Sequence, residues 1–285
     1  ATINVSGYSG VYDGAAHGAT GTATGVGGED LSAGLNLGAT FTDVPGGTAT
    51  WTFSGGTNYN DQSGSVAIVI GKAAATINVS GYSGVYDGAA HGATGTATGI
   101  GGVDLSAGLN LGSTFTDVPG GTATWTFSGG TNYIDQNGSV AIVIGKAIAT
   151  VTVSGYSGVY DGAAHGATGT ATGVGGEDLS SFLTLGDSFT EVPGGTATWT
   201  FSGGTNYNDQ SGGVAIVIGK AAATINVSGY TGVYDGAAHG ATGTAVGVLG
   251  ESLGGLNLGA TFTDVPGGTA TWTFSGGTNY TDQSD

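Results

Sequence analysis

The sequence predicts an all-β protein, a tandem array of four small immunoglobulin-like antiparallel β-sandwich modules. The first observation is an internal repeat: ATINVSGY at residue 1 returns at residue 75, at residue 149 as ATVTVSGY, and at residue 223. The period is 74 residues. The second is that short stretches of alternating apolar and polar residues are separated by Gly-, Pro- and Asn-rich turns, without a helical period. Several short strands at this spacing are typical of a β-sandwich.

Five segments of the first repeat are predicted to be strands: residues 2–6, 19–24, 35–37, 48–54 and 65–70. In the fourth of these, Ala49, Trp51 and Phe53 fall on one face and threonines on the other, as in a half-buried antiparallel strand. Residues 65–70 are apolar on both faces except for a small alanine, which predicts a central strand. Turn signals lie between them, at residues 12–14, 25–28, 45–47 and 54–58.

The repeats predict four modules, at residues 1–74, 75–148, 149–222 and 223–285. Residues 70–77 join two predicted strands with hardly any linker, so we expect a fairly stiff tandem. The last module lacks the SVAIVI-type strand that the other three have at Val66, Val140 and Val214. We expect a chain that was cut there, with a strand donated by another molecule as the alternative. The first residue is not Met, which suggests a processed chain or a window of a longer one.

Composition excludes several partners. Three Lys and no Arg face twenty Asp and Glu, giving a net charge of -17. Nucleic-acid binding depends on cationic contacts to phosphate, so neither nucleic acid nor an anionic membrane surface is an expected partner. There is no apolar run long enough to span a bilayer and no Cys. The 62 Gly resemble a linker composition, but the regular Val, Ile, Trp and Tyr content indicates folded modules instead.

Several motifs together resemble a known family of repeats. They are VYDGAAH at residues 11–17, GEDL at 28–31, FTDVPGG at 41–47, Asn58-Tyr59, and IGKA at 70–73. In these motifs the chain resembles the MBG (mostly beta, glycine-rich) and YDG-type immunoglobulin-like repeats of bacterial surface and secreted adhesin-like proteins. The resemblance covers all four repeats and implies an extracellular β-sandwich array. It implies no catalytic residue.

The Tyr-Asp-Gly and histidine positions are the first candidate sites. Asp13, Asp87, Asp161 and Asp235 could each be a cation ligand, although a turn with Asp bonded to its own backbone is the interpretation we favour. His17, His91, His165 and His239 are the only histidines. A metal site or general base needs partners at defined spacing, and only the Asp four residues earlier is near. We therefore favour a surface or turn histidine.

The oxygen-rich segment at residues 58–64 could bind calcium. Its Asn60 is replaced by Ile134 and Thr281 in other repeats, and it lacks EF-hand spacing. Glu29 and Asp30 are poor candidates for the same reason, because Val103 and Ser252 take their places. We predict no cofactor, with calcium as a weaker alternative.

The three lysines and the threonine rows have two interpretations each. Lys72, Lys146 and Lys220 follow the last strand and are predicted to be solvated junction residues; the alternative is an isopeptide bond to Asn, which would lower the mass by one ammonia. Threonines at 20, 22 and 24 and at 48, 50 and 52 fit the wet face of a strand. An ice- or carbohydrate-binding array is the alternative, weakened by Val246 in place of Thr24.

The sequence predicts a non-catalytic protein. It has neither a nucleophile-elbow pattern in a strand-turn-helix setting nor a phosphate-binding loop, and we assign no catalytic, cofactor-binding or metal residue. The predicted function is a stalk or spacer of a bacterial extracellular adhesin or surface fibre. The alternatives are a fibre subunit joined by strand complementation and a module whose loops bind glycan or protein. A glycan platform would need Trp51, Trp125, Trp199 and Trp272 in the open.

Overall fold

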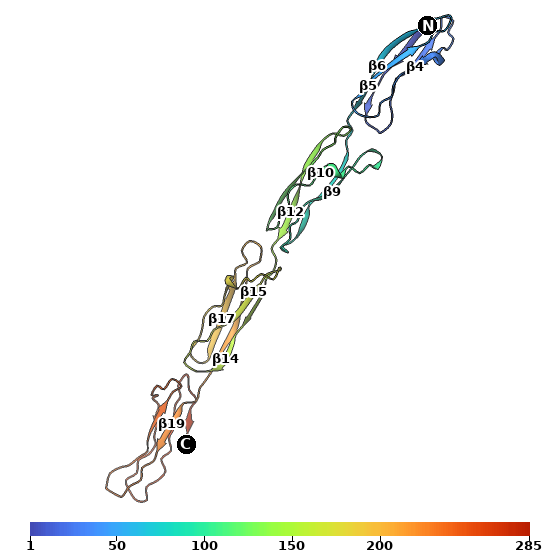
Figure 1. The fold of residues 1–285 in the computed structure, drawn as a ribbon. Helices are drawn as coiled ribbons and strands as arrows, with labels where there is room; N and C mark the ends of the chain where they lie inside the picture. Colours follow the sequence, from blue (N-terminus) through green and yellow to red (C-terminus); the bar gives the residue numbers. More distant parts are fainter. The chain divides into compact units, whose positions relative to one another are not determined.

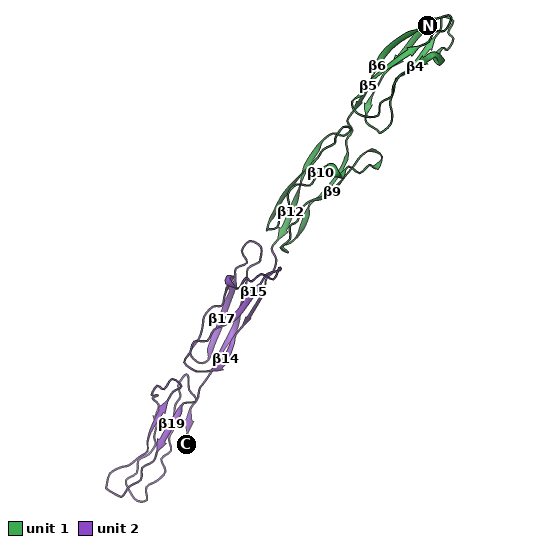
Figure 2. Ribbon diagram, in the orientation of Figure 1, with its two compact units in different colours: residues 1–145 green, residues 146–285 purple.

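The computed structural model describes residues 1–285, and its regular elements are β-strands and four single 3-10 turns (Figure 1). This confirms the predicted all-β fold class and its repetition. No helix in it has the length and apolar character needed to cross a bilayer. The chain divides into two compact units, Ala1–Gly145 and Lys146–Asp285, each of which contains about two sequence repeats (Figure 2).

Unit 1 holds the first two repeats. Repeat 1 has β1 (Thr2–Ser6), β2 (Tyr8–Val11), β3 (Thr20–Thr24), η1 (Ser32–Gly34), β4 (Leu35–Asn36), β5 (Gly46–Phe53) and β6 (Gln62–Gly71). Repeat 2 has β7 (Thr76–Ser80), β8 (Tyr82–Val85), β9 (Thr94–Thr98), η2 (Ile100–Gly102), η3 (Ser106–Gly108), β10 (Leu109–Asn110), β11 (Gly120–Phe127) and β12 (Gln136–Gly145). The two lists differ by one 3-10 turn, so the near-identical sequences give near-identical strands.

Unit 2 holds the other two repeats. Repeat 3 has β13 (Thr150–Ser154), β14 (Tyr156–Val159), β15 (Thr168–Thr172), η4 (Ser180–Phe182), β16 (Leu183–Thr184), β17 (Gly194–Phe201) and β18 (Gln210–Gly219). Repeat 4 has β19 (Thr224–Ser228), β20 (Thr242–Val246), β21 (Leu256–Asn257), β22 (Thr273–Phe274) and β23 (Gln283–Ser284). Repeat 4 therefore forms less regular structure than the other three.

Each of the first three repeats forms two sheets. In repeat 1, β1 pairs with β3 antiparallel, and the second sheet has the order β2-β6-β5-β4. The predicted central strand is indeed central, because β6 pairs antiparallel with β5 and parallel with β2. The parallel pair is an addition to the prediction, which described antiparallel strands and had no strand at Tyr8–Val11.

Each of the first three repeats has buried side chains at two levels. Near one end, Ile216 and Ile218 of β18 pack with Ala197 of β17, and each isoleucine is 1% exposed. The second level is seen in repeat 2, where Phe127 and Tyr133 pack with Ala97 and with Ala73, which precedes that repeat in the chain. Ala221 packs in the same way with Phe274 and Tyr280 of repeat 4, so the alanine that precedes each of these two repeats belongs to the core of the repeat that follows it.

Repeat 4 differs in its second sheet. Here three strands pair in the order β21-β22-β23, and β23 corresponds to the start of β6. Residues 230–233, which correspond to β2, form no strand. Tyr230 and Val233 are accordingly 51% and 85% exposed.

Candidate functional site

The Tyr-Asp-Gly turn is a small network of side chains. Asp13 Oδ1 accepts a hydrogen bond from the Ala15 N–H at 2.8 Å and lies 2.9 Å from His17 Nε2. The His17 ring stacks on Tyr8 with centroids 3.8 Å apart. The hydrogen bond with His17 is the largest cause that lowers the pKa of Asp13, and the hydrogen bond from the Ala15 amide is the next. The same network occurs in all four repeats, and it occupies the carboxylate oxygen with a turn amide and an imidazole.

Tyr12 extends from this turn toward the next repeat. Its ring packs edge-on against Tyr133 of repeat 2, with centroids 5.5 Å apart. In unit 2, Tyr160 packs against Tyr280 in the same way at 5.6 Å. The turn thus positions an aromatic ring at the junction between successive repeats.

The Lys-Ala segment before each repeat binds along an edge of that repeat. The Ala73 N–H donates to the Asn132 carbonyl and the Ile134 N–H donates to the Ala73 carbonyl, both at 2.9 Å. The Lys72 ammonium donates to the Gly130 carbonyl at 2.6 Å. Lys72 is exposed, as predicted, but it has a backbone partner. The same bonds hold Lys146-Ala147 on repeat 3 and Lys220-Ala221 on repeat 4.

Asn132 completes this junction. Its side-chain amide donates to Asp43 Oδ1 at 2.8 Å and accepts from the Val44 N–H at 3.0 Å. The carboxylate makes the first of these a charge-assisted bond. In unit 2, Asn279 makes the same two bonds, to Glu191 and to the Val192 amide.

Sequence reasoning named Asn58-Tyr59 as one of the repeat motifs but did not assign these asparagines, or the tyrosines that follow them, to the junction. A signal was present: every repeat has Asn-Tyr at this place, whereas the next residue is Asn60, Ile134, Asn208 or Thr281. The backbone bonds of Ala73 explain the difference, because they use the main chain of that next residue and not its side chain.

Glu29 holds a loop beside the junction. It accepts a hydrogen bond from the Tyr59 hydroxyl and another, at 2.9 Å, from the Gly27 N–H. The Val26 N–H donates to the Tyr59 oxygen at 3.1 Å. The bond from Tyr59 is the main cause that lowers the pKa of Glu29, and the same bond raises the pKa of Tyr59. Glu177 and Glu251 repeat this arrangement, whereas repeat 2 has Val103 in this position.

We expect acid to loosen this loop in three repeats but not in repeat 2. The pKa of Glu29 in the folded protein is below its ordinary value of 4.5. The ionised carboxylate therefore stabilises the loop in full at pH values above 4.5. This stabilisation is lost as the pH falls through the lowered pKa of Glu29 in the folded protein. Hydrogen-exchange protection of residues 25–30 should therefore decrease between pH 6 and pH 3 relative to residues 99–104. Equal losses in the two loops would contradict the assignment.

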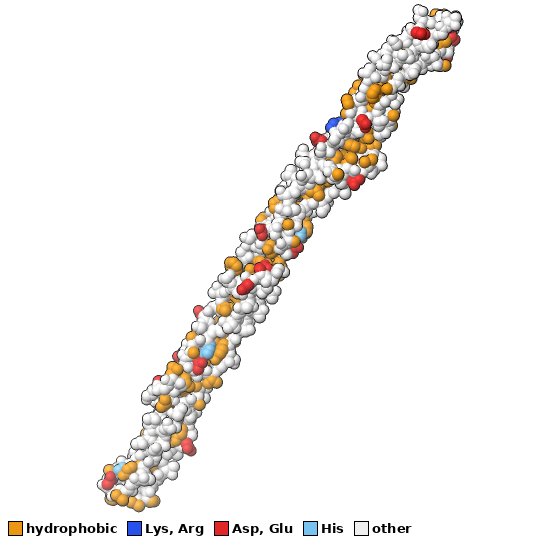
Figure 3. Space-filling view, in the orientation of Figure 1, with side chains coloured by type: hydrophobic (Ala, Val, Ile, Leu, Met, Phe, Trp, Pro, Cys, Tyr) orange, Lys and Arg blue, Asp and Glu red, His pale blue; other side chains and the backbone are white.

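The remaining candidates lie apart from one another. Asp61 Oδ1 accepts from the Gly55 N–H at 2.8 Å, and no group of three or more His, Asp or Glu side chains is placed to hold a metal ion. On the face shown in Figure 3, acidic side chains occur singly and do not form one patch. The four tryptophans are partly buried. Trp51 lies over Gly64 of the neighbouring strand, while the threonines of β5 are exposed.

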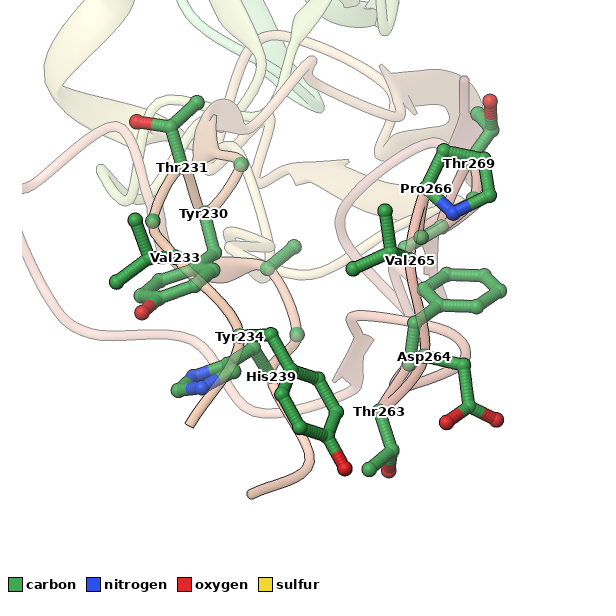
Figure 4. A pocket seen from close by; sticks show the side chains of 18 of the residues that line it. Tyr230, Thr231, Val233, Tyr234, His239, Thr263, Asp264, Val265, Pro266 and Thr269 are labelled. Carbon is green, nitrogen blue, oxygen red and sulfur yellow. The ribbon is translucent and has the colours of Figure 1, made fainter. Parts of the chain in front are cut away.

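A groove opens in repeat 4 (Figure 4). It has a volume of about 610 Å³ and lies between residues 229–241 on one side and 262–270 on the other. Tyr230 and Tyr234 belong to the first wall, and Val265 and Pro266 to the second. Tyr234 and Val265 are 64% and 77% exposed, so the groove presents apolar surface to solvent.

No family model and no curated protein matches the chain. The resemblance to MBG and YDG-type repeats therefore stays a prediction. Among solved structures, domains 4–9 of the surface layer protein SbsC align with 75% of this chain at 15% identity and a TM-score of 0.21. The alignment covers 44% of the SbsC chain, less than half its length. Immunoglobulin domains 1–5 of Sidekick-1 align with 85% of this chain and 67% of their own at 13% identity and a TM-score of 0.26.

Proposed function

We propose that this chain is a non-catalytic stalk or spacer segment of an extracellular adhesin or surface fibre. The observation that carries the proposal is the junction built from Lys72, Ala73 and Asn132. Backbone hydrogen bonds, a buried alanine and the hydrogen bond between the Asn132 and Asp43 side chains all connect one repeat to the next. A connection of this kind opposes bending between repeats, which is what a spacer needs. A flexible linker would instead leave the ends of its repeats solvated.

Two further features support a spacer. The acidic, Gly- and Thr-rich surface, with a net charge of -17, favours solubility. Trp51, Trp125 and Trp199 lie over glycines of the neighbouring strand, and none of the four tryptophans stands in the open as a surface on which a glycan could stack. The extracellular location is part of the proposal and has its support in the resemblance to bacterial surface repeats. Antibody labelling of intact source cells would test it.

Replacing Asn132 by alanine should loosen the junction between the first two repeats. Loss of its two side-chain bonds should cost about 1–2 kcal/mol of junction stability. The chain has no Cys, so Thr50→Cys and Thr124→Cys supply two unique, exposed sites for spin labels. Pulsed electron-spin measurements should give a narrow distance distribution for the doubly labelled chain and a broader one after Asn132→Ala.

Asn58→Ala is the matched control for this experiment. Asn58 is the equivalent residue of repeat 1, and in the structure its exposed side chain makes no hydrogen bond. This variant should leave the distance distribution unchanged. A broad distribution in the parent chain, or no broadening with Asn132→Ala, would contradict a junction that resists bending.

A further inference from the structure

The Tyr-Asp-Gly turn of repeat 3 is covered by a leucine of repeat 4. Gly162 of this turn has φ +79°, and a Cβ on it would lie 2.6 Å from Cδ1 and 2.9 Å from Cγ of Leu249. The leucine side chain therefore lies directly against the glycine, in the space that a side chain there would need. Leu249 remains 66% exposed, so the turn covers only part of it. This contact joins two repeats of the same compact unit and is additional to the hydrogen bonds of the junction.

The loop that carries Leu249 is held in place by hydrogen bonds. Glu251 accepts one from the Leu249 N–H at 2.9 Å and another from the Tyr280 hydroxyl. The Val248 N–H donates to the Tyr280 oxygen at 3.0 Å. Tyr280 is 5% exposed, and its ring packs against Tyr160, which belongs to the same turn as the covered glycine. The loop is thus fixed to a buried tyrosine that itself contacts repeat 3, and this holds the leucine over the turn.

The junction between repeats 1 and 2 lacks this contact. The residue equivalent to Leu249 is Gly101, and Val103 takes the place of the glutamate. The loop also has a different backbone, because Gly101 has φ +70° whereas the φ of Leu249 is negative. A Cβ on Gly14, the equivalent of Gly162, would have no atom within 4 Å. The two junctions therefore share their hydrogen bonds and their tyrosine pair but differ in the cover over the turn.

We propose that Leu249 is a positioning residue of the spacer, which makes the junction between repeats 3 and 4 stiffer than the junction between repeats 1 and 2. This inference rests on the stalk function proposed above and adds that its junctions are unequal. Bending between repeats 3 and 4 would separate the leucine from the turn and return apolar surface to water, which is unfavourable. The same motion between repeats 1 and 2 is opposed only by the contacts that both junctions share. The chain therefore bends more readily at its first junction.

The test compares two matched pairs of spin labels on the 285-residue chain. Cysteines replace exposed threonines at equivalent positions of equivalent strands. Thr22 and Thr96 report on the junction between repeats 1 and 2, and Thr170 and Thr244 on the junction between repeats 3 and 4. Pulsed electron-spin measurements should give a narrower distance distribution for the second pair than for the first.

Leu249→Gly should broaden the distribution of the second pair to the width of the first. The loop should keep its form in this variant, because Gly27 and Gly175 stand at the same place beside a glutamate in repeats 1 and 3. Hydrogen exchange of residues 273–284 should stay unchanged, which separates loss of the contact from unfolding of the repeat. Val233→Gly is the control, because it removes a side chain that is 85% exposed elsewhere in repeat 4 and should leave the width unchanged.

A double variant transfers the contact to the first junction. Gly101→Leu together with Val103→Glu gives the loop of repeat 2 the leucine and the glutamate of repeat 4, and it should narrow the distribution of the first pair. An unchanged width after Leu249→Gly, or no narrowing by the double variant, would overturn the proposal. Equal and narrow distributions for the two pairs in the parent chain would overturn it and leave the stalk function standing. Equal and broad distributions would contradict the stalk function as well.

Discussion

Replacing Phe127 by alanine is expected to lower the free energy of unfolding of the second repeat by about 3–5 kcal/mol. Phe127 is 2% exposed and packs in the cluster that contains Ala73, Ala97 and Tyr133. Truncation removes apolar contacts and leaves a cavity, because alanines on the neighbouring strands are too small to fill the space. The effect should reach the junction, since Ala73 shares this core with the repeat that follows it.

Hydrogen exchange measured peptide by peptide can assign this loss to one repeat, which a single melting curve of a four-repeat chain cannot. Protection should fall across residues 120–145 and change little across residues 194–219. Phe182→Ala is the matched control, because this phenylalanine is 55% exposed and its loss should cost less than about 0.5 kcal/mol. Similar losses from the two substitutions would mean that Phe127 is not a core residue.

The strands that the sequence predicted well are those with a local pattern. Residues 48–54 alternate strictly, and β5 spans Gly46–Phe53 with Ala49 and Phe53 buried and the threonines exposed. The apolar run at residues 65–70 identified the central strand β6. A local pattern is sufficient for such segments, because the order of apolar and polar residues along the strand shows whether one or both of its faces are buried.

Strand β2 was not predicted from the sequence, and there is a physical reason for this. It has four residues, one of which is Gly10, a residue that usually weakens strands. Its partner is β6, parallel to it and some sixty residues later in the chain, with Tyr8 opposite Ile68. The Tyr8 ring covers Gly10, where a Cβ would lie 2.3 Å from the hydroxyl oxygen. Neither the distant partner strand nor the tyrosine ring over the glycine produces a regular alternation of apolar and polar residues that a sequence would show.

The junction was predicted only in outline. The short connection at residues 70–77 indicated restricted motion, and Lys72 was placed at the junction. The contact between Asp43 and Asn132 joins residues 89 positions apart, which no spacing within one repeat reveals. Repeat 3 has Glu191 in place of the aspartate and keeps the bond to Asn279. A carboxylate at this position is therefore what the junction requires, and the length of its side chain is secondary.

Gly120→Ala is expected to destabilise the second repeat by about 2–5 kcal/mol, the sum of a left-handed backbone penalty and a steric clash. Gly120 has φ +86°, and a Cβ there would lie 2.1 Å from the carbonyl oxygen of Ile142 on the central strand. That strand is held on both sides by hydrogen bonds, so it cannot move away without breaking the pairing with β8 or β11.

Gly102→Ala separates the two causes. Gly102 has nearly the same φ of +83° in the same repeat, but no atom lies within 4 Å of its Cβ position. This variant should show the backbone penalty alone, about 1–2 kcal/mol. The difference between the two variants, measured by hydrogen exchange of residues 136–145, isolates the close approach of β11 and β12. Equal destabilisation would show that the strand can yield, and the tight pairing of Gly120 with Val143 would then not explain why glycine occupies this position.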